Sequence, residues 1–168
     1  MRRAVIRTKI KEIEECVGLV EEHLPETFEE FSEMGLLKDG IYKRTEFAIE
    51  DVFDICAVIN TDLELGIPGD DEEIVENLVK NNILSEEIKE KIRLMKGFRN
   101  IVVHRYGKID DELGFEILKE NLQDFYDFIE EIAAVLELEN GERESRERES
   151  RGRERRENEN TSSEDILS

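Results

Sequence analysis

The chain has 168 residues, of which 40% are charged and 38% hydrophobic, enough apolar side chains for one domain with a modest core. Its 44 acidic and 24 basic residues give a formal net charge of −20, which argues against a general nucleic-acid binder, because such proteins usually present a basic surface. Without a signal peptide, a stretch of roughly 18 apolar residues or a close cysteine pair, we expect a soluble cytoplasmic protein with no membrane contact, disulfide or zinc site.

The first part of the chain predicts three helices. The first ends at Pro25 and has apolar residues three and four positions apart, which is typical of an amphipathic helix. These residues are Ile6, Ile10, Ile13, Val17, Val20 and Leu24. Thr27 and Glu30 then form a capping box that opens a short element through Met34. A third helix is expected to start near Ile41. It carries Ala48, Val52, Ile55 and Ile59.

The next segment predicts a loop and two more helices. Residues 66–69 read Gly-Ile-Pro-Gly, a loop signal, and Asp70 with Glu73 resembles a cap for a short helix. That helix carries Ile74, Leu78 and Val79. Ser85 is a good N-cap for the following helix, which Gly107 would end.

The last part predicts one long helix and a charged tail. The helix begins at Asp110 or Asp111, and its apolar residues are again spaced by three and four. They are Phe115, Leu118, Leu122, Phe125, Ile129, Ile132 and Leu136. Residues 139–168 have 10 acidic residues and 7 arginines, with no apolar side chain before Ile166. Such a segment buries too little surface to order itself in a core, so we expect it to be disordered or a helical extension.

These elements together predict an all-α protein. Long amphipathic helices with short connections indicate an antiparallel bundle of four to six helices, formed by residues 1–138. The tail is not the cause of the negative charge, because residues 1–138 alone have 34 acidic and 17 basic residues. A site for RNA in this body would have to be locally basic.

The helix that follows Ser85 has an arginine where its apolar pattern would continue. Ile88, Ile92 and Met95 predict apolar residues at positions 99 and 102, and position 99 is Arg99. Departures from local patterning concentrate at functional sites. The structural alternative is that Arg99 covers apolar surface or pairs with a carboxylate such as Glu50 or Asp54.

His104 follows Arg99 by five residues, which places the two side chains about 140° apart around a helix. They can converge only because arginine is long and the helix is expected to end nearby. Histidine is the side chain whose ordinary pKa suits proton transfer near neutral pH. The alternative is a histidine stabilised by the negative end of the helix dipole.

The segment from Met95 to Tyr106, Met-Lys-Gly-Phe-Arg-Asn-Ile-Val-Val-His-Arg-Tyr, resembles the signature of the HEPN superfamily. It is similar to the narrower R-x4-H-x-Y form of HepT ribonuclease toxins. A weaker match is Arg44 with Glu50 and Asp54 on the third helix. The resemblance covers residues 1 to about 138 and implies a HEPN-like helical fold, whereas the Arg/Glu tail and the acidic body are not part of it.

The resemblance implies metal-independent RNA cleavage with no cofactor. His104 would be the catalytic base or acid, Arg99 would clamp the phosphate, and Asn100 would orient one of these groups. It also implies a homodimer, in which a two-fold axis brings together the motifs of two chains. That arrangement would concentrate Arg99, Arg105 and Lys108 into a basic patch.

The resemblance further implies a toxin–antitoxin pair. A cognate minimal nucleotidyltransferase would act as antitoxin by attaching AMP to Tyr106, where the added phosphates would repel RNA. Two alternatives stay open. In the first, the chain is a non-catalytic nucleotide-binding module that acts with a nucleotidyltransferase. In the second, it is a helical scaffold in which Arg99 and His104 serve stability.

Overall fold

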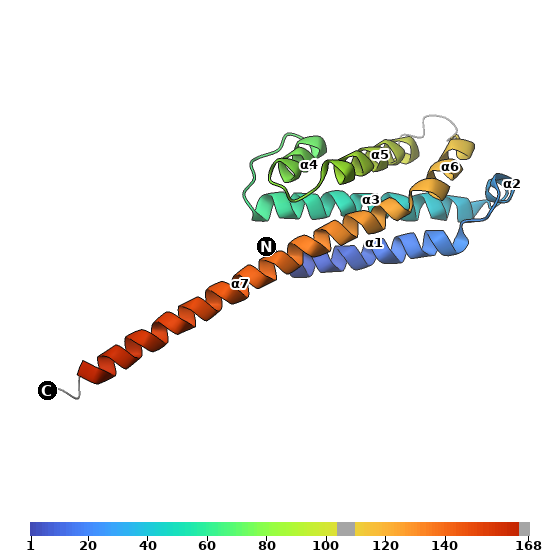
Figure 1. The fold of residues 1–168 in the computed structure, drawn as a ribbon. Coiled ribbons are helices and arrows are strands. Elements are labelled where there is room, and N and C mark those ends of the chain that lie inside the picture. The colour runs from blue at the N-terminus through green and yellow to red at the C-terminus, as the bar shows by residue number, and fades with distance from the viewer. Residues whose placement is uncertain (104–109, 165–168) are drawn as a thin grey trace. The chain divides into compact units, whose positions relative to one another are not determined.

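The computed structural model describes residues 1–103 and 110–164, and this part of the chain contains seven helices and no strand (Figure 1). The all-α prediction is therefore confirmed. The helices are α1 (Arg3–His23), α2 (Phe28–Ser32), α3 (Leu36–Asp62), α4 (Asp71–Lys80), α5 (Glu86–Val103), α6 (Asp111–Asn121) and α7 (Gln123–Glu164). None of the helices in these two ranges is long and apolar enough to span a membrane.

The chain divides into two compact units, Met1–Ile132 and Ala133–Ser168. The second unit is helical through Glu164, because α7 continues into the Arg/Glu-rich segment. In the sequence of this segment arginine and glutamate recur three and four residues apart, a spacing that favours a helix even without an apolar core. The boundary after residue 138, which follows the change in composition, stays a prediction.

Helix α3 is the central element of the first unit. It contacts α1 along one side and both α4 and α5 along another (Figure 1). Helices α1 and α3 run side by side in opposite directions. The predicted apolar positions of α1 fill this contact, with Ile6, Ile13, Val17 and Val20 all buried. Both cysteines are buried, as expected for small apolar side chains.

Three predicted helix starts have the expected caps. Thr27 and Glu30 form both bonds of the capping box of α2, and the Asp70 side chain accepts from the backbone N–H of Glu73 at 2.9 Å. The Ser85 hydroxyl accepts from the backbone N–H of Ile88 at 3.2 Å. Helix α3 instead begins five residues before Ile41, directly after Gly35, whose φ of 59° favours glycine.

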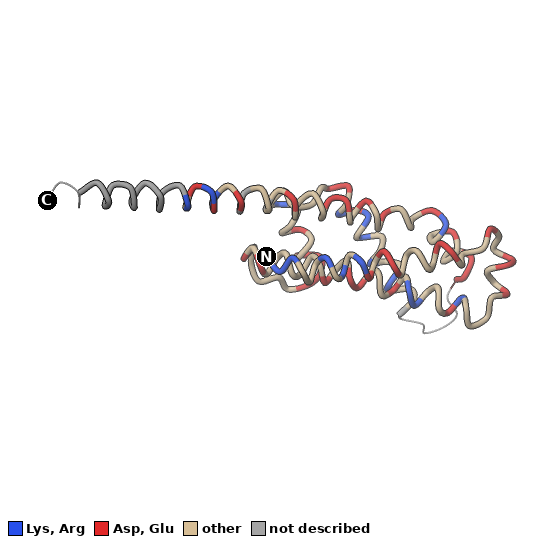
Figure 2. Tube along the Cα trace, turned by 90° about the horizontal axis from the view of Figure 1, so that it is seen from below, with Lys and Arg blue, Asp and Glu red and all other residues tan. Residues whose placement is uncertain are grey.

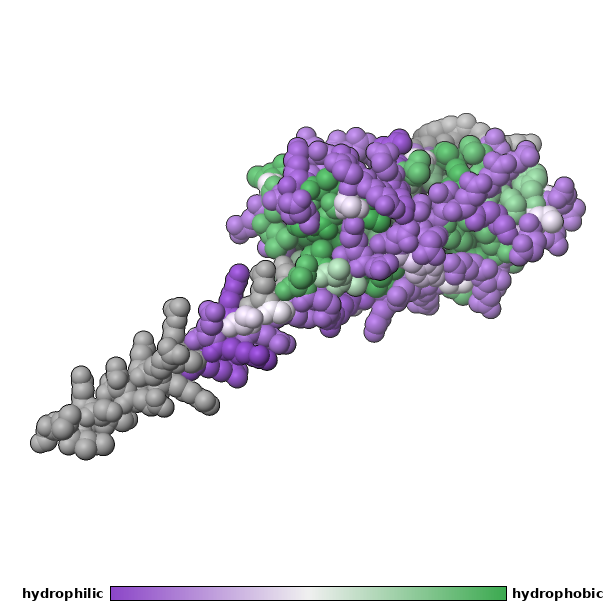
Figure 3. Space-filling view, in the orientation of Figure 1, coloured by the Kyte–Doolittle hydropathy of each residue, from purple (hydrophilic) through white to green (hydrophobic). Residues whose placement is uncertain are grey.

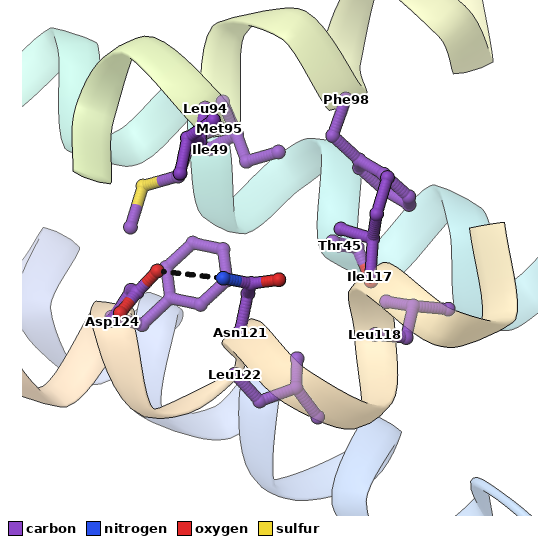
Figure 4. A pocket seen from close by; sticks show the side chains of 11 residues that line it. Thr45, Ile49, Leu94, Met95, Phe98, Ile117, Leu118, Asn121, Leu122 and Asp124 are labelled. Carbon is purple, nitrogen blue, oxygen red and sulfur yellow. Dashed lines mark hydrogen bonds between the residues drawn. The ribbon is translucent and has the colours of Figure 1, made fainter. Parts of the chain in front are cut away.

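The prediction of one long last helix is wrong. Leu122 is a turn residue between α6 and α7, and the two helices meet at an angle (Figures 1 and 4). The three-and-four spacing continues across the break, because Phe115, Leu118 and Phe125 are all buried. Spacing alone therefore could not locate the bend. With this extra break the described residues form seven helices, where four to six were expected.

Charged side chains of both signs are interspersed along the helices of the first unit, with acidic residues in the majority (Figure 2). Hydrophilic residues cover much of the visible surface of this unit (Figure 3). The acidity is therefore spread over the fold, and no single acidic segment accounts for it.

Candidate active site at the end of helix α5

The buried residues of α5 form a stripe that changes spacing at its last turns. Ile88, Ile92 and Met95 are buried as predicted, and the next buried residues are Phe98 and Val102. The spacing from Met95 to the next buried residue, Phe98, is three residues, whereas the sequence pattern predicted a spacing of four. This difference moves Arg99 from the centre of the buried face to its edge.

Arg99 is held by an aromatic ring and a carboxylate. Its guanidinium carbon lies 4.7 Å from the centre of the Phe53 ring on α3, within the range of a cation–π interaction. Its Nη2 donates to the Oδ2 of Asp71 on α4 at 3.2 Å. The side chain is only 19% exposed. The side chain of Arg99 is therefore held by contacts from two other helices, α3 and α4.

The carboxylate that pairs with Arg99 is not one of those expected. Asp54 instead accepts from the Nζ of Lys9 at 2.6 Å, and Glu50 is exposed on the outward side of α3. Asp71 comes from a helix whose approach to α5 could not be read from spacing. The structural alternative expected Arg99 to pair with a carboxylate, and it does. The carboxylate is Asp71, however, and not Glu50 or Asp54.

The first turn of α4 lies against α5 through a second ion pair. Lys96 Nζ donates to the Oε1 of Glu72 at 2.8 Å, one turn before Arg99. Asp71 and Glu72 also lie at the positive end of the α4 dipole, where carboxylates are favourable. These two pairs link the first turn of α4 to the end of α5 that carries the motif.

Tyr42 on α3 contacts the chain on both sides of residues 104–109. Its ring centre lies 6.2 Å from that of Phe98 on α5. Its hydroxyl donates to the Oδ1 of Asp111, the first residue of α6, at 2.8 Å. Lys38 donates to the other oxygen of the same carboxylate at 2.6 Å. Tyr42 is only 1% exposed, so this contact is part of the core.

Sequence reasoning missed Tyr42 and Asp71. Tyr42 follows Ile41 directly and has no motif of its own, and Asp71 is one of several acidic residues that begin α4. The one sequence feature that could have indicated the contact of Tyr42 was the pair of consecutive aspartates, Asp110 and Asp111. Only the first is needed as a cap: Asp110 accepts from the backbone N–H of Leu113 at 3.1 Å.

Of the four predicted site residues, the structure describes two. Arg99 and Asn100 both lie in the last turns of α5, and Asn100 is exposed. His104 and Tyr106 lie outside the described residues, as do Arg105, Gly107 and Lys108. Within residues 1–103 and 110–164, no three His, Cys, Asp or Glu side chains gather as they would around a metal ion.

A small apolar cavity lies beside α5. It has a volume of about 30 Å³ and lies between α3, α5, α6 and the start of α7, with Met95, Phe98 and Leu118 among its walls (Figure 4). A space of this size holds about one water molecule. The polar side chains at its rim, Asn121 and Asp124, bond to each other at 3.3 Å. The cavity is a packing feature with no room for a nucleotide.

Comparison with known proteins gives a consistent match. The family described as ribonuclease HepT-like matches residues 13–132. The mRNA nuclease HepT of Shewanella oneidensis is 27% identical over 130 residues, which are 77% of this chain and 97% of that protein. A protein of Archaeoglobus fulgidus that is predicted to be an RNase is 31% identical over 137 residues, which are 82% of this chain and 97% of that protein.

Solved structures agree with this match. The tri-AMPylated HEPN toxin of Shewanella oneidensis, solved in complex with its MNT antitoxin, has a TM-score of 0.70 and 27% identity, and the match covers 77% of this chain and 97% of that one. The cytosolic protein YutE of Bacillus subtilis has the same fold, with a TM-score of 0.70, 17% identity and coverage of 83% and 93%. The chain belongs to the ribonuclease HepT-like family of HEPN proteins.

Proposed function

We propose that the chain is a metal-independent RNA endonuclease and the toxin of a toxin–antitoxin pair, acting in the cytoplasm. The observation that carries this proposal is the setting of Arg99. An arginine that is stacked on Phe53 and bonded to Asp71 stands at the helix end that leads into His104. The family match over residues 13–132 includes this whole arrangement.

The proposed chemistry needs a proton carrier and a cation. The ribose 2′-OH attacks the adjacent phosphorus, the P–O5′ bond breaks, and a 2′,3′-cyclic phosphate and a free 5′-OH remain. His104 takes the proton from the 2′-OH or gives one to the leaving 5′-oxygen. Arg99 stabilises the negative charge on the phosphorane oxygens, because its planar guanidinium can bond two oxygens at once. Asn100 orients one of these groups.

The contacts of Arg99 suit such a role. The bond to Asp71 engages one of the five N–H donors of the guanidinium, and Asp71 is 40% exposed. A partly exposed ion pair contributes little free energy, so a phosphate can replace the carboxylate at small cost. The Phe53 ring meanwhile keeps the guanidinium in place. Asp71 thus orients the guanidinium of Arg99 in the free protein, and a phosphate of the substrate replaces Asp71 when RNA binds.

A homodimer would supply two things that a single chain lacks for this chemistry, a second histidine and a locally basic surface. One histidine cannot easily be both acid and base, and RNA must bind to a chain with a net charge of −20. A two-fold axis would bring a second His104 and a second Arg99 to the same cleft. Arg105 and Lys108 of both chains would add to a locally basic surface within the acidic body.

We further propose that a cognate minimal nucleotidyltransferase, the antitoxin, silences the nuclease by attaching AMP to Tyr106. The relative from Shewanella oneidensis supports this, since it was solved as a tri-AMPylated toxin with an MNT antitoxin. Each added phosphodiester brings a negative charge beside Arg99 and His104. It would occupy the anion site and repel the RNA backbone.

A second candidate function is a nucleotide-binding module without nuclease activity that acts with a nucleotidyltransferase. The net charge of −20 favours it, because a nucleotide is a smaller anion than RNA. Arg99 and His104 would then hold a nucleotide for the transferase. Nucleotide binding in the absence of any RNA cleavage would distinguish this module from the nuclease.

Cleavage of RNA in EDTA tests the proposal directly. Wild type is expected to cut and leave 2′,3′-cyclic phosphate ends, whereas Arg99→Ala and His104→Ala are expected to lose at least about 100-fold in rate. Arg93→Ala is the matched control, because Arg93 is an exposed arginine on the same helix that bonds Glu90. No cutting by wild type, or equal cutting by all variants, would favour the nucleotide-binding module.

A further inference from the structure

Helix α5 is the only one of the seven described helices whose residues have a net positive charge. It has five basic and three acidic residues, whereas α4, which lies beside it, has one basic and four acidic residues (Figure 1). Each of the other described helices is acidic overall. A chain that binds RNA despite a net charge of −20 needs a locally basic surface. Among the described helices, α5 is the one that can provide it.

Three cations of α5 form a row that ends at the candidate site. Lys89, Lys96 and Arg99 lie within about 80° of one another around the helix axis and span about 15 Å along it. This cationic row runs along one side of α5 toward the helix end that carries the motif. The other two cations, Lys91 and Arg93, bond carboxylates of α7 and of α5 itself.

Each residue of the cationic row is paired with a carboxylate of α4. The pairs follow one another in antiparallel order along the two helices. They are Arg99–Asp71 at 3.2 Å, Lys96–Glu72 at 2.8 Å and Lys89–Glu76 at 2.6 Å. Helix α4 therefore presents three negative charges in a line to α5, as a segment of nucleic-acid backbone would.

The carboxylates of these pairs can be exchanged for another anion. The side chains of Glu72 and Glu76 are 71% and 38% exposed, and those of Lys96 and Lys89 are 25% and 31% exposed. An ion pair that water and salt can reach contributes little free energy. Neither Glu72 nor Glu76 belongs to the buried core of α4. A phosphate can therefore take the place of either carboxylate while the helix stays packed.

We propose that the cationic row is a track that binds the RNA backbone next to the candidate site. The three carboxylates of α4 occupy this track in the free chain and compete with the RNA for it. When RNA binds, its phosphates displace them one by one, which extends the anion site of Arg99 along α5 to Lys96 and Lys89. The inference rests on the proposed function, since it takes RNA as the substrate.

The length and the residue types of the cationic row suit this role. Its length of about 15 Å corresponds to about four nucleotides of a stacked strand. Lysine is a compact charge on a flexible stem, which suits phosphates whose positions differ from one RNA to the next. Arginine, with its planar guanidinium, suits the single phosphate at the reaction. The track adds affinity without selecting a sequence, because phosphate contacts do not read the bases.

Binding of an RNA that cannot be cut tests the track separately from the chemistry. The probe is a short fluorescent oligoribonucleotide with 2′-O-methyl groups, which lacks the attacking 2′-OH. Glu72→Gln and Glu76→Gln are each expected to raise its affinity for the full chain about two- to fivefold, because the RNA no longer has to displace a carboxylate. Glu90→Gln is the matched control, since it removes the same charge from an exposed pair outside the cationic row and should change the affinity little.

Removal of a cation from the row gives a second measurement. Lys96→Ala is expected to weaken binding and to reduce the slope of log affinity against log salt by about 0.7, the contribution of one phosphate contact with a single strand. Lys96→Arg keeps the charge and is expected to keep the wild-type slope. Arg93→Ala is the matched control, because it removes a cation of the same helix that lies outside the row. Circular dichroism would verify that each variant is folded, and a merely structural role of Lys96 would leave the salt slope unchanged.

The results that contradict the track are distinct from failure of the nuclease proposal. The track would be overturned if Glu72→Gln and Glu76→Gln bound the probe no better than Glu90→Gln, or if Lys96→Ala had the same salt slope as Arg93→Ala. Absence of probe binding by wild type would overturn it as well, even if wild type cuts RNA in EDTA. Binding that responds to these substitutions as expected, in a chain that does not cut RNA, would support the track and overturn the nuclease.

Discussion

The hydroxyl of Tyr42 donates a 2.8 Å hydrogen bond to the Oδ1 of Asp111, the first residue of α6. The ring of the same tyrosine packs against Phe98 on α5. One buried side chain on α3 therefore contacts the chain both before and after residues 104–109, which include His104 and Tyr106. The two ends of the motif segment share a single anchor in the core.

Tyr42→Phe is expected to destabilise the protein by about 1 to 2 kcal/mol, because it removes a hydrogen bond to a carboxylate and leaves the ring in place. Urea unfolding followed by circular dichroism would measure this change. The control is Tyr126→Phe, whose hydroxyl donates to Glu21 at 3.2 Å near the surface. An equal decrease in the free energy of unfolding of both variants would show that the bond to Asp111 stabilises the protein no more than the surface bond of Tyr126.

Gly114→Ala is expected to cost about 1 to 3 kcal/mol, the usual penalty of overpacking a core. A Cβ at this position of α6 would lie 2.6 Å from the Tyr42 hydroxyl and 3.1 Å from its ring. Gly18→Ala on α1 is the matched control, because a Cβ added there would meet no atom within 4 Å apart from its own stretch of helix. That substitution should be neutral or slightly stabilising, since alanine is the better helix former. Thermal unfolding of the two variants would compare them, and equal midpoints would contradict the close approach.

Arg99→Lys is expected to lower the rate of RNA cleavage by about 10- to 100-fold although it keeps the positive charge, because lysine lacks the planar fork that bonds two phosphate oxygens. Lysine would also stack less well on the Phe53 ring. Single-turnover cleavage at saturating RNA would measure the chemical step. Arg93→Lys on the solvent side of α5 should keep the wild-type rate. An Arg99→Lys enzyme with full activity would show that Arg99 acts only as a charge.

Acid stability is expected to depend on Asp127. The hydrogen bond from Lys91, at 2.7 Å, and then that from Gln123 lower the pKa of this carboxyl below its ordinary value, although burial opposes them. The unfolded chain therefore takes up the proton at a higher pH, about 4, than the folded chain does. The stabilisation is complete above that pH and is lost as the pH falls through the folded pKa.

Asp127→Asn should accordingly be less stable than wild type near neutral pH and should lose less further stability below about pH 4. Urea midpoints measured from about pH 6 down to about pH 2.5 would follow this loss. Glu130→Gln, at an exposed position of the same helix, is the control. An unchanged pH slope in Asp127→Asn would contradict the role of the Lys91 bond.

Several local features were predictable because they depend on neighbouring residues alone. The capping box of Thr27 and Glu30, the Asp70 cap and the Ser85 cap all follow from side chains that bond the backbone three residues away. The bend at Leu122 was not predictable, because apolar spacing is the same in a straight helix and in two helices that share a core. The sequence also placed position 99 on the buried face of α5, whereas the structure buries Phe98. This difference of one residue depends on how α5 packs on α3.

The sequence by itself determined the all-α class, most helix ends and the motif that contains Arg99, because helix periodicity, caps and motif spacing are local properties. Only the tertiary structure decided which carboxylate meets Arg99, which ring lies beneath it and which tyrosine connects α5 to α6. Asp71, Phe53 and Tyr42 come from other helices, 28, 46 and 69 residues away from their partners. Such contacts depend on how helices pack, and no local pattern of residues encodes that arrangement.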